Sequence, residues 1–284
     1  MPDQEAHPVR VGLVPWRRDT AGRLLVGLAR DEGAVHLPSG QVDGRHPLTS
    51  ALAAVQPGVR LGPPGPRRAV DGSAGSPRAW YWPVEVLDGP DGLHWRPPAD
   101  VDGDEGDLAV AATSGLAAAG RQVVLVRHAR AGERDGWDGP DAERPLDTRG
   151  RAQADALASL LAAYGVQRIH SSDARRCLET VGPLAAALGL PVLAEPLLSE
   201  DGSAGDPAGA ERLVADLVTR PGQAVLCTQR KTLGRVLPAL LTGLGVEPTS
   251  VRVPRKGGLL VLHLADDPAG AATVEALEPP QVQA

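Results

Sequence analysis

Two different patterns of hydrophobic and polar positions divide the chain. In the first part, four short apolar runs bounded by turn-forming residues predict β-strands. They occupy residues 9–14, 23–28 and 79–87 and the run around Trp95. A single helical pattern, residues 48–55, ends at Pro57 and Gly58. We therefore predict an α+β domain over residues 1–119, and segment 97–120 is expected to form a terminal helix and a linker.

From Gln122 onward, strand-like and helix-like patterns alternate. Asp173 is expected to cap the second of the helices. Strands separated by helices of this length predict an α/β domain, residues 120–284, with a mostly parallel sheet covered on both faces. Ligands of such sheets bind beyond the carboxyl ends of the strands. The predicted strands are residues 122–127, 166–172, 190–195, 223–228 and 258–264, and the predicted helices are 148–164, 174–188, 207–219 and 231–241.

The charge balance restricts the partners that the protein can have. The 284 residues carry a net charge of −6, which argues against a nucleic-acid or membrane partner. An anionic substrate must therefore be held by a local group of basic side chains. Cys177 and Cys227 do not form a CxxC pair and are predicted to be reduced thiols. The N-terminus lacks a signal pattern and the apolar runs are too short to span a membrane, so we expect a cytoplasmic protein.

The first predicted strand of the second domain ends in Arg127-His128, which suits phosphoryl transfer. A neutral imidazole nitrogen can attack phosphorus while neighbouring guanidinium groups neutralise the phosphoryl oxygens. For the dipeptide alone, the simpler alternative is a strand-end histidine held by hydrogen bonds. Two polar segments follow in order, ERPLDTRGRAQADAL at residues 143–157 and SSDARRCLET at residues 171–180. Their presence favours the phosphoryl-transfer interpretation.

Together these segments resemble the RHG, RPLTxxGxxQA and SSxxxRxxQT motifs of the histidine phosphatase superfamily, over residues 122–264. The likeness is greatest to SixA-type phosphatases and to the phosphatase half of two-domain MutT-type enzymes. It implies that His128 is the nucleophile, which forms a transient phosphohistidine, and that Arg127 and Arg176 bind the phosphoryl group. Arg175 is the neighbour that could exchange roles with Arg176.

Two positions depart from this family pattern. Where the family has a second histidine in an SHG pattern, this chain has Gln229, whose amide can donate a hydrogen bond but brings no charge. Lys231 could restore that charge, and the MutT-type resemblance extends to this TQxK pattern. Glu200 stands where the family has its proton donor, with Asp201 as the alternative acid. A phosphate leaving group needs less protonation than an alcohol, so Glu200 could equally be an ordinary loop acid.

Other residues extend the predicted site. Arg134, on a glycine-rich loop, is either an additional phosphate contact or a solvated surface residue. Arg255 and Lys256 precede the last strand, and the MutT-type resemblance implies that they bind a polyphosphate tail; an ordinary turn is the alternative. Asp147 and Thr148 are expected to cap a helix.

The segment HLPSGQVDGRHPLTSALAAVQPG, residues 36–58, resembles the beginning of a Nudix box but lacks its acidic helix. That box uses several carboxylates to hold Mg²⁺ against pyrophosphate oxygens. Here Asp43 is the only acidic residue between positions 33 and 70, and His46 stands near the first glutamate position. The resemblance therefore implies a Nudix-like domain that has lost its metal site. The sequence AWYWPVEVL, residues 79–87, could present a base-stacking face or pack into the core.

These patterns predict a two-domain phosphohydrolase that uses a phosphohistidine intermediate and needs no metal or other cofactor. The MutT-type resemblance implies nucleotide or dinucleoside polyphosphate substrates. The alternatives are a SixA-type phosphatase acting on phosphohistidine in a partner protein, and a non-catalytic nucleotide-binding protein.

Overall fold

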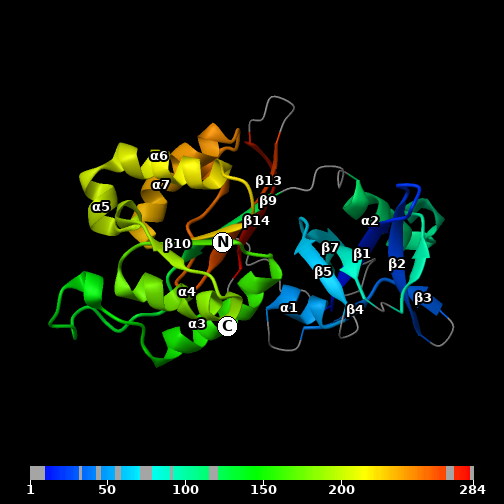
Figure 1. Ribbon diagram of the computed structural model, residues 1–284, viewed down its shortest axis with the longest axis horizontal. Helices are drawn as coiled ribbons and strands as arrows, with labels where there is room; N and C mark the ends of the chain where they lie inside the picture. The colour runs from blue at the N-terminus through cyan, green and yellow to red at the C-terminus, as the bar shows by residue number, and fades with distance from the viewer. Residues whose placement is uncertain are drawn as a thin grey trace. The chain divides into compact units, whose positions relative to one another are not determined.

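The computed structural model divides the chain into two compact units, Met1–Ala118 and Ala119–Ala284 (Figure 1). It describes residues 10–31, 34–42, 46–54, 59–70, 79–89, 92–114, 121–266 and 272–281. Each unit has its own sheet and its own buried core, and each is described below by itself.

The first unit is built on one mixed sheet of eight strands. β1 (Arg10–Arg18) lies between β2 (Leu24–Asp31) and β7 (Ala79–Asp88). β1 and β7 run parallel, whereas the other described strand pairs are antiparallel. The shorter strands are β3 (Ala34–His36), β4 (Ser39–Gln41), β5 (Arg60–Pro64), β6 (Arg68–Val70) and β8 (His94–Arg96). With α1 (Pro47–Leu52) and α2 (Gly103–Thr113), this is the strand-rich α+β arrangement that the pattern predicted.

The aromatic residues of β7 belong to the core. Trp80, Tyr81 and Trp82 are only 4%, 6% and 0% exposed, and Tyr81 packs in one cluster with Val14 of β1 and Ala109 of α2. Core packing is therefore confirmed for this strand, and the alternative of an exposed base-stacking face is wrong.

The segment that resembles a Nudix box is described only in part. The predicted helix 48–55 is α1, which begins at Pro47 and ends at Leu52, while Val55 and Asp43 lie outside the described residues. His46 is the N-cap of α1, and its Nδ1 accepts a hydrogen bond from the Leu48 backbone N–H at 3.2 Å. A capping role thus accounts for this histidine, and the Nudix likeness of the first unit stays a prediction.

The second unit has a six-stranded sheet in the order β11-β10-β12-β9-β13-β14. β11 (Val192–Ala194), β10 (Arg168–Ser171), β12 (Ala224–Thr228) and β9 (Arg121–Arg127) are mutually parallel. β13 (Leu259–Asp266) runs antiparallel to β9 and forms a hairpin with β14 (Ala272–Gln281). The sheet is therefore mixed, which corrects the mostly parallel arrangement expected for it. The chain returns from its last helix through an irregular segment and enters β13 from the opposite end of the sheet.

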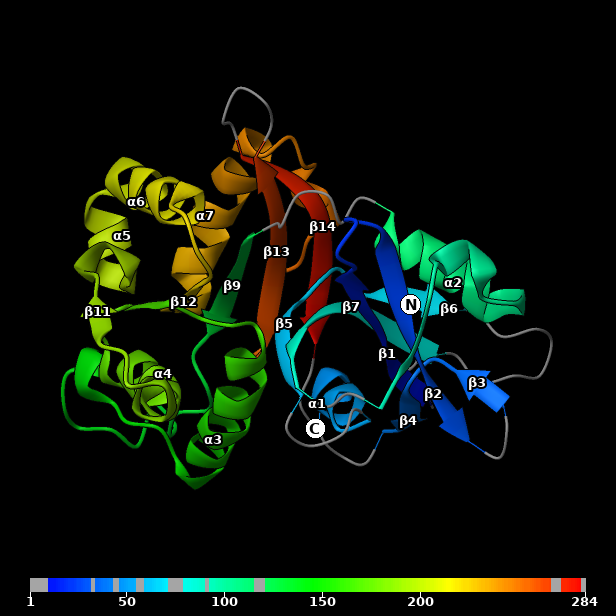
Figure 2. The same cartoon turned by 45° about the vertical axis from the view of Figure 1, so that its right-hand side comes forward.

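The predicted helices of the second unit are present and cover both faces of this sheet (Figure 2). α3 (Thr148–Ala163) and α4 (Arg175–Leu188) lie on one side. α6 (Pro207–Thr219) and α7 (Arg230–Gly243) lie on the other side, where the apolar faces of these two helices pack on β9, β12 and β13. A short helix, α5 (Glu200–Gly205), occupies a stretch that was expected to be a loop. The four predicted helices are α3, α4, α6 and α7.

Two helix caps test the expectations from the sequence. Asp147 caps α3 as predicted, because its Oδ1 accepts the Gly150 backbone N–H at 2.7 Å. The cap assigned to Asp173 is wrong: the N-cap of α4 is Ala174, which makes no side-chain capping bond.

The start of α3 requires a glycine at position 150, since a Cβ atom there would lie 1.8 Å from the Arg130 carbonyl oxygen. The lack of a side chain at Gly150 thus allows the loop that follows β9 to lie directly against the start of α3.

Candidate active site

The candidate site lies where three parallel strands end side by side. Arg127, the last residue of β9, is paired with Thr228 of β12, and Ser171 of β10 is paired with Cys227. The next residues along the chain are His128, Ser172 and Gln229. Backbone bonds continue the sheet, from His128 N–H to the Thr228 carbonyl at 3.0 Å and from Ser172 N–H to the Cys227 carbonyl at 2.9 Å. The sheet thus brings together three residues that are far apart in the sequence.

His128 is buried with one ring nitrogen fixed and the other available as a base or nucleophile. Its side chain is 6% exposed, and Nδ1 lies 2.7 Å from the Ala129 carbonyl oxygen. Because a carbonyl can only accept, Nδ1 carries the proton and Nε2 carries the lone pair. The pKa of His128 is lowered to about 3, chiefly by burial and also by the charges of Arg176, Arg127 and Lys256, while the bond to Ala129 acts in the opposite direction. The ring is therefore neutral at physiological pH.

This pKa predicts an unusual titration for His128. Protonation would remove the Nε2 lone pair only as the pH falls toward about 3, far below the ordinary histidine value of 6.5. An NMR titration between about pH 5 and pH 8 is expected to leave the His128 ring signals unmoved, whereas an unperturbed histidine titrates within that window. The His128→Ala spectrum assigns the signals. A midpoint near 6.5 for His128 would contradict the buried, cation-flanked environment.

Arg176 lies beside His128 and is held by Asp141 through two contacts. The guanidinium is 2% exposed; Nη1 donates to the Asp141 carbonyl oxygen, and Nη2 donates to Asp141 Oδ2 at 2.9 Å. These bonds occupy the edge of the guanidinium formed by its two terminal nitrogens. Nε, on the other edge, is buried without a hydrogen-bond partner among the described residues. An anion could therefore be bound through the edge that contains Nε.

Asp141 is a site residue that the sequence reasoning missed. Besides Arg176, its Oδ1 accepts a bond from Arg144 Nε at 3.0 Å and lies 3.8 Å from Arg134 Nε. Partial burial raises the pKa of Asp141, but the charges of Arg176 and Arg144 outweigh that effect, so its pKa is lowered and it is a carboxylate. It stands three residues before the arginine of the RPL segment, and no local pattern indicated its contact with α4.

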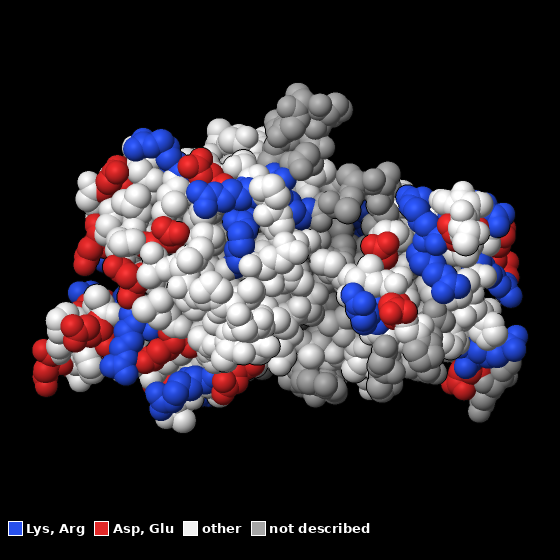
Figure 3. Space-filling model, in the orientation of Figure 1, with Lys and Arg blue, Asp and Glu red and all other residues white. Residues whose placement is uncertain are grey.

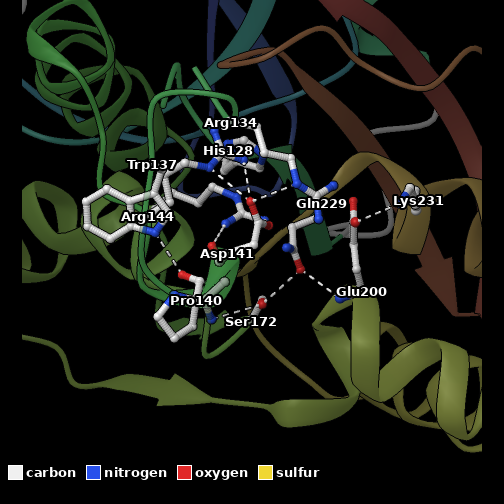
Figure 4. Close-up of polar contacts among 12 residues, drawn as sticks. His128, Arg134, Trp137, Pro140, Asp141, Arg144, Ser172, Glu200, Gln229 and Lys231 are labelled. Carbon is white, nitrogen blue, oxygen red and sulfur yellow. Dashed lines mark hydrogen bonds and ion pairs between the residues drawn. The ribbon is translucent and has the colours of Figure 1, made fainter. Parts of the chain in front are cut away.

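Gln229, which the resemblance sets against the second family histidine, has an amide whose orientation is determined by its neighbours. Oε1 accepts the Glu200 backbone N–H at 2.8 Å and lies 3.3 Å from Ser172 Oγ (Figure 4). Because a backbone N–H can only donate, the oxygen must face Glu200 and the amide nitrogen must face the other way. The side chain is 4% exposed. Gln229 can thus offer an N–H donor to an anion beside His128.

Glu200 and Lys231 form an ion pair at the edge of this group. Lys231 Nζ lies 3.4 Å from Glu200 Oε2, and in Figure 4 both lie beyond Gln229, on the side away from Trp137 and Pro140. The pKa of Arg127 is lowered, because burial and the charge of Arg230 outweigh the opposite effect of the Glu200 carboxylate. Asp201, the alternative acid, is exposed.

The remaining sequence candidates divide into near and peripheral residues. Arg127 donates from Nη1 to the Pro254 carbonyl oxygen at 3.1 Å, and the Gly257 N–H bonds to the carbonyl oxygens of Arg127 and His128 at 3.1 and 3.0 Å. The turn that contains Lys256 is thereby tied to the end of β9, and Lys256 is close enough to lower the pKa of His128. Arg255, in the same turn, is exposed.

Arg134 and Arg175 are two further candidates, and both are exposed. Arg134 is 71% exposed, and its Nε lies 3.8 Å from Asp141 Oδ1. Arg175 is 56% exposed and pairs with Glu179 at 2.7 Å on the surface of α4. Arg176, and not Arg175, is thus the buried member of the pair, and it is close enough to His128 to lower its pKa.

The site's positive charge is local. On the face drawn in Figure 3, basic and acidic side chains are interspersed, with wide uncharged areas between them. Among the described residues, no group of three His, Cys, Asp or Glu side chains is placed to hold a metal ion.

The two thiols, Cys177 and Cys227, are free and buried, and burial raises the pKa of Cys227. None of the described helices is long and apolar enough to cross a membrane.

Comparison with known proteins relates part of the chain to a phosphatase superfamily. Residues 123–244 match the model of the histidine phosphatase superfamily (branch 1). A protein of Mycolicibacterium smegmatis named 8-oxo-(d)GTP phosphatase is 41% identical over 150 residues, 51% of this chain and 45% of that protein. The chain thus spans about half the length of this relative.

The comparison with solved structures gives two phosphatases among the similar chains. The protein histidine phosphatase SixA with tungstate is 20% identical, covers 56% of this chain and 96% of its own, and has a TM-score of 0.42. A mycobacterial glucosyl-3-phosphoglycerate phosphatase with VO3 is also 20% identical, covers 56% and 98%, and has a TM-score of 0.43. The family match, residues 123–244, falls within the second unit, which contains His128. The second unit is a histidine phosphatase superfamily domain.

Proposed function

We propose that this protein is a phosphohydrolase that transfers a phosphoryl group from a nucleoside polyphosphate to His128 and then to water. The observation that carries the proposal is the neutral His128 ring, whose Nδ1–H is held by Ala129 while the cations Arg127 and Arg176 stand near it. A nitrogen lone pair flanked by guanidinium groups supplies both the attack on phosphorus and the neutralisation of its oxygens.

The reaction has two steps. First, the Nε2 lone pair of His128 forms a bond to phosphorus, and the bond from phosphorus to the leaving oxygen breaks with its electron pair on that oxygen. Second, a water oxygen attacks phosphorus and the phosphorus–Nε2 bond breaks. Its electron pair returns to the ring, and one proton of the water passes to solvent as orthophosphate leaves. Arg127, Arg176 and the Gln229 amide hold the non-bridging oxygens in both steps.

The surroundings of Glu200 favour a substrate with a good leaving group. Its carboxylate is paired with Lys231 at 3.4 Å, at the edge of the site beyond Gln229. A diphosphate leaving group is a weak base and departs without a proton, whereas an alkoxide does not. A phosphoanhydride therefore suits this site better than an ester of a simple alcohol.

The number of cations favours more than one phosphate. Arg230 lies close enough to Arg127 to lower its pKa, Lys256 lies close enough to His128 to lower its pKa, and Lys231 stands at the edge of the site beside Glu200. One phosphoryl group needs fewer positive charges than these residues supply together with Arg127 and Arg176. The relative named 8-oxo-(d)GTP phosphatase supports a nucleotide as the carrier of the phosphates.

The substrate class can be tested directly. The protein is incubated with nucleoside triphosphates, dinucleoside polyphosphates and a phosphohistidine protein, and orthophosphate release is measured. We expect release from nucleoside triphosphates. Release from the phosphohistidine protein alone would favour a SixA-type activity, and release from none of them would favour a nucleotide-binding protein without catalysis.

Turnover is expected to be independent of divalent metal. The nucleophile is an imidazole and the phosphate oxygens are bound by side-chain cations, so a metal-activated water is not needed. With nucleoside triphosphate freed of metal and an excess of chelator, the rate should stay within about twofold of that with Mg²⁺, because no Lewis acid contributes to the barrier. Loss of activity on chelation, with recovery on adding Mg²⁺, would contradict the mechanism.

A further inference from the structure

One aromatic residue beside the site is not explained by the fold. Trp137 lies in the loop between β9 and α3 and is the only tryptophan after residue 118. It is partly exposed, and the residues on either side of it, Gly136 and Asp138, are exposed. The indole therefore keeps part of its surface accessible to solvent, in a stretch whose other residues, 133–136 and 138–140, are exposed.

The ring is nevertheless held in one orientation. Trp137 Nε1–H donates to the Pro140 carbonyl oxygen at 3.0 Å. The ring also lies against Gly139, where a Cβ atom would be 3.1 Å from the indole. A residue with a side chain at position 139 would therefore push the ring away. The loop presents a fixed aromatic plane.

This plane is connected to the phosphate-binding residues by direct contacts. Pro140, which accepts the indole bond, is followed by Asp141, which holds Arg176. The Trp137 backbone N–H donates to the Arg134 carbonyl at 3.1 Å, and Arg134 Nε lies 3.8 Å from Asp141. Figure 4 shows Trp137 and Pro140 beside Asp141 and Arg144, on the side of the site opposite Lys231.

We propose that Trp137 stacks on the base of a nucleoside polyphosphate whose terminal phosphoryl group lies at His128. This inference rests on the proposed function and names the residue that distinguishes a nucleotide from inorganic polyphosphate. Indole is a favourable stacking partner for any nucleobase, and a fixed ring loses little entropy on binding. The exposed Arg134, in the same turn, lies 3.8 Å from Asp141.

Steady-state kinetics with two substrates test the proposal. Values of kcat/KM are measured for GTP and for inorganic triphosphate with the full-length protein, Trp137→Ala and Trp137→Phe. Loss of a stacked base costs about tenfold or more in binding, so Trp137→Ala should lower the ratio of GTP to triphosphate kcat/KM by about tenfold. Trp137→Phe keeps a stacking face without the N–H, so it should restore most of that ratio.

The two variants separate stacking from support of the loop. If the indole only holds the loop through Pro140, both substrates would lose activity equally, and Trp137→Phe would behave like Trp137→Ala. Either that pattern or an unchanged ratio in Trp137→Ala would overturn the proposal.

Binding without turnover provides a second measurement. In His128→Ala, GTP should quench tryptophan fluorescence, inorganic triphosphate should quench it less, and most of the difference should vanish in His128→Ala/Trp137→Phe. Absence of quenching assigned to Trp137 would overturn the inference even if GTP is hydrolysed. Conversely, quenching by GTP in a protein that hydrolyses neither compound would support the inference and refute the proposed phosphohydrolase.

Discussion

His128→Ala is expected to lower kcat/KM for nucleoside triphosphate by about a thousandfold or more, because it removes the atom that accepts phosphorus. The residual rate would come from binding and from the arginine side chains. Orthophosphate release in the steady state measures the effect. Brief incubation with terminally labelled substrate, followed by an alkaline quench, should give a labelled protein only when His128 is present.

The control for this variant is its folded state. The ring is buried, so its removal leaves a small cavity, but the Arg127 and Thr228 backbone contacts that continue the sheet do not involve the side chain. We expect cooperative thermal unfolding and unchanged far-ultraviolet circular dichroism. Turnover close to that of the unmodified protein, in a folded His128→Ala, would end the phosphohistidine mechanism.

Arg176→Ala is expected to have the next largest effect, a loss in kcat/KM of about a hundredfold or more, because a preorganised charge on the phosphoryl group is removed. Arg175→Ala is a matched control on the same turn of α4. Arg175 is 56% exposed and pairs with Glu179, so its removal should change kcat/KM by less than about twofold, as for most surface substitutions. Equal effects of the two substitutions would show that Arg176 does not bind substrate.

Asp141 is expected to act through Arg176. Asp141→Asn keeps a side-chain oxygen but removes the charge that orients the guanidinium, and we expect a loss of about tenfold in kcat/KM. In an Arg176→Ala background the same substitution should have little further effect, because the group that it positions is absent. Independent, multiplicative losses would show instead that Asp141 contributes by another route.

Local patterns along the chain were sufficient to predict most elements of the second unit. Helices α3, α4, α6 and α7 and the buried strands follow from the spacing of apolar residues, which is a local property. The direction of β13 could not be predicted in the same way. A buried strand has the same apolar run whether it lies parallel or antiparallel to its neighbour, so only packing of the complete sheet decides its direction.

The candidate site shows the same division. By itself, the sequence determined the strand-end position of His128 and, through the family resemblance, indicated Arg127, Arg176 and Gln229. Only the tertiary structure showed that Arg176 is the buried member of the pair 175–176, that Asp141 holds it, and that Glu200 fixes the Gln229 amide. The Asp141–Arg176 contact joins residues 35 positions apart in the chain, and the Glu200–Gln229 contact joins residues 29 positions apart. Which side chains meet across such separations depends on strand order and helix packing, and no local pattern records either.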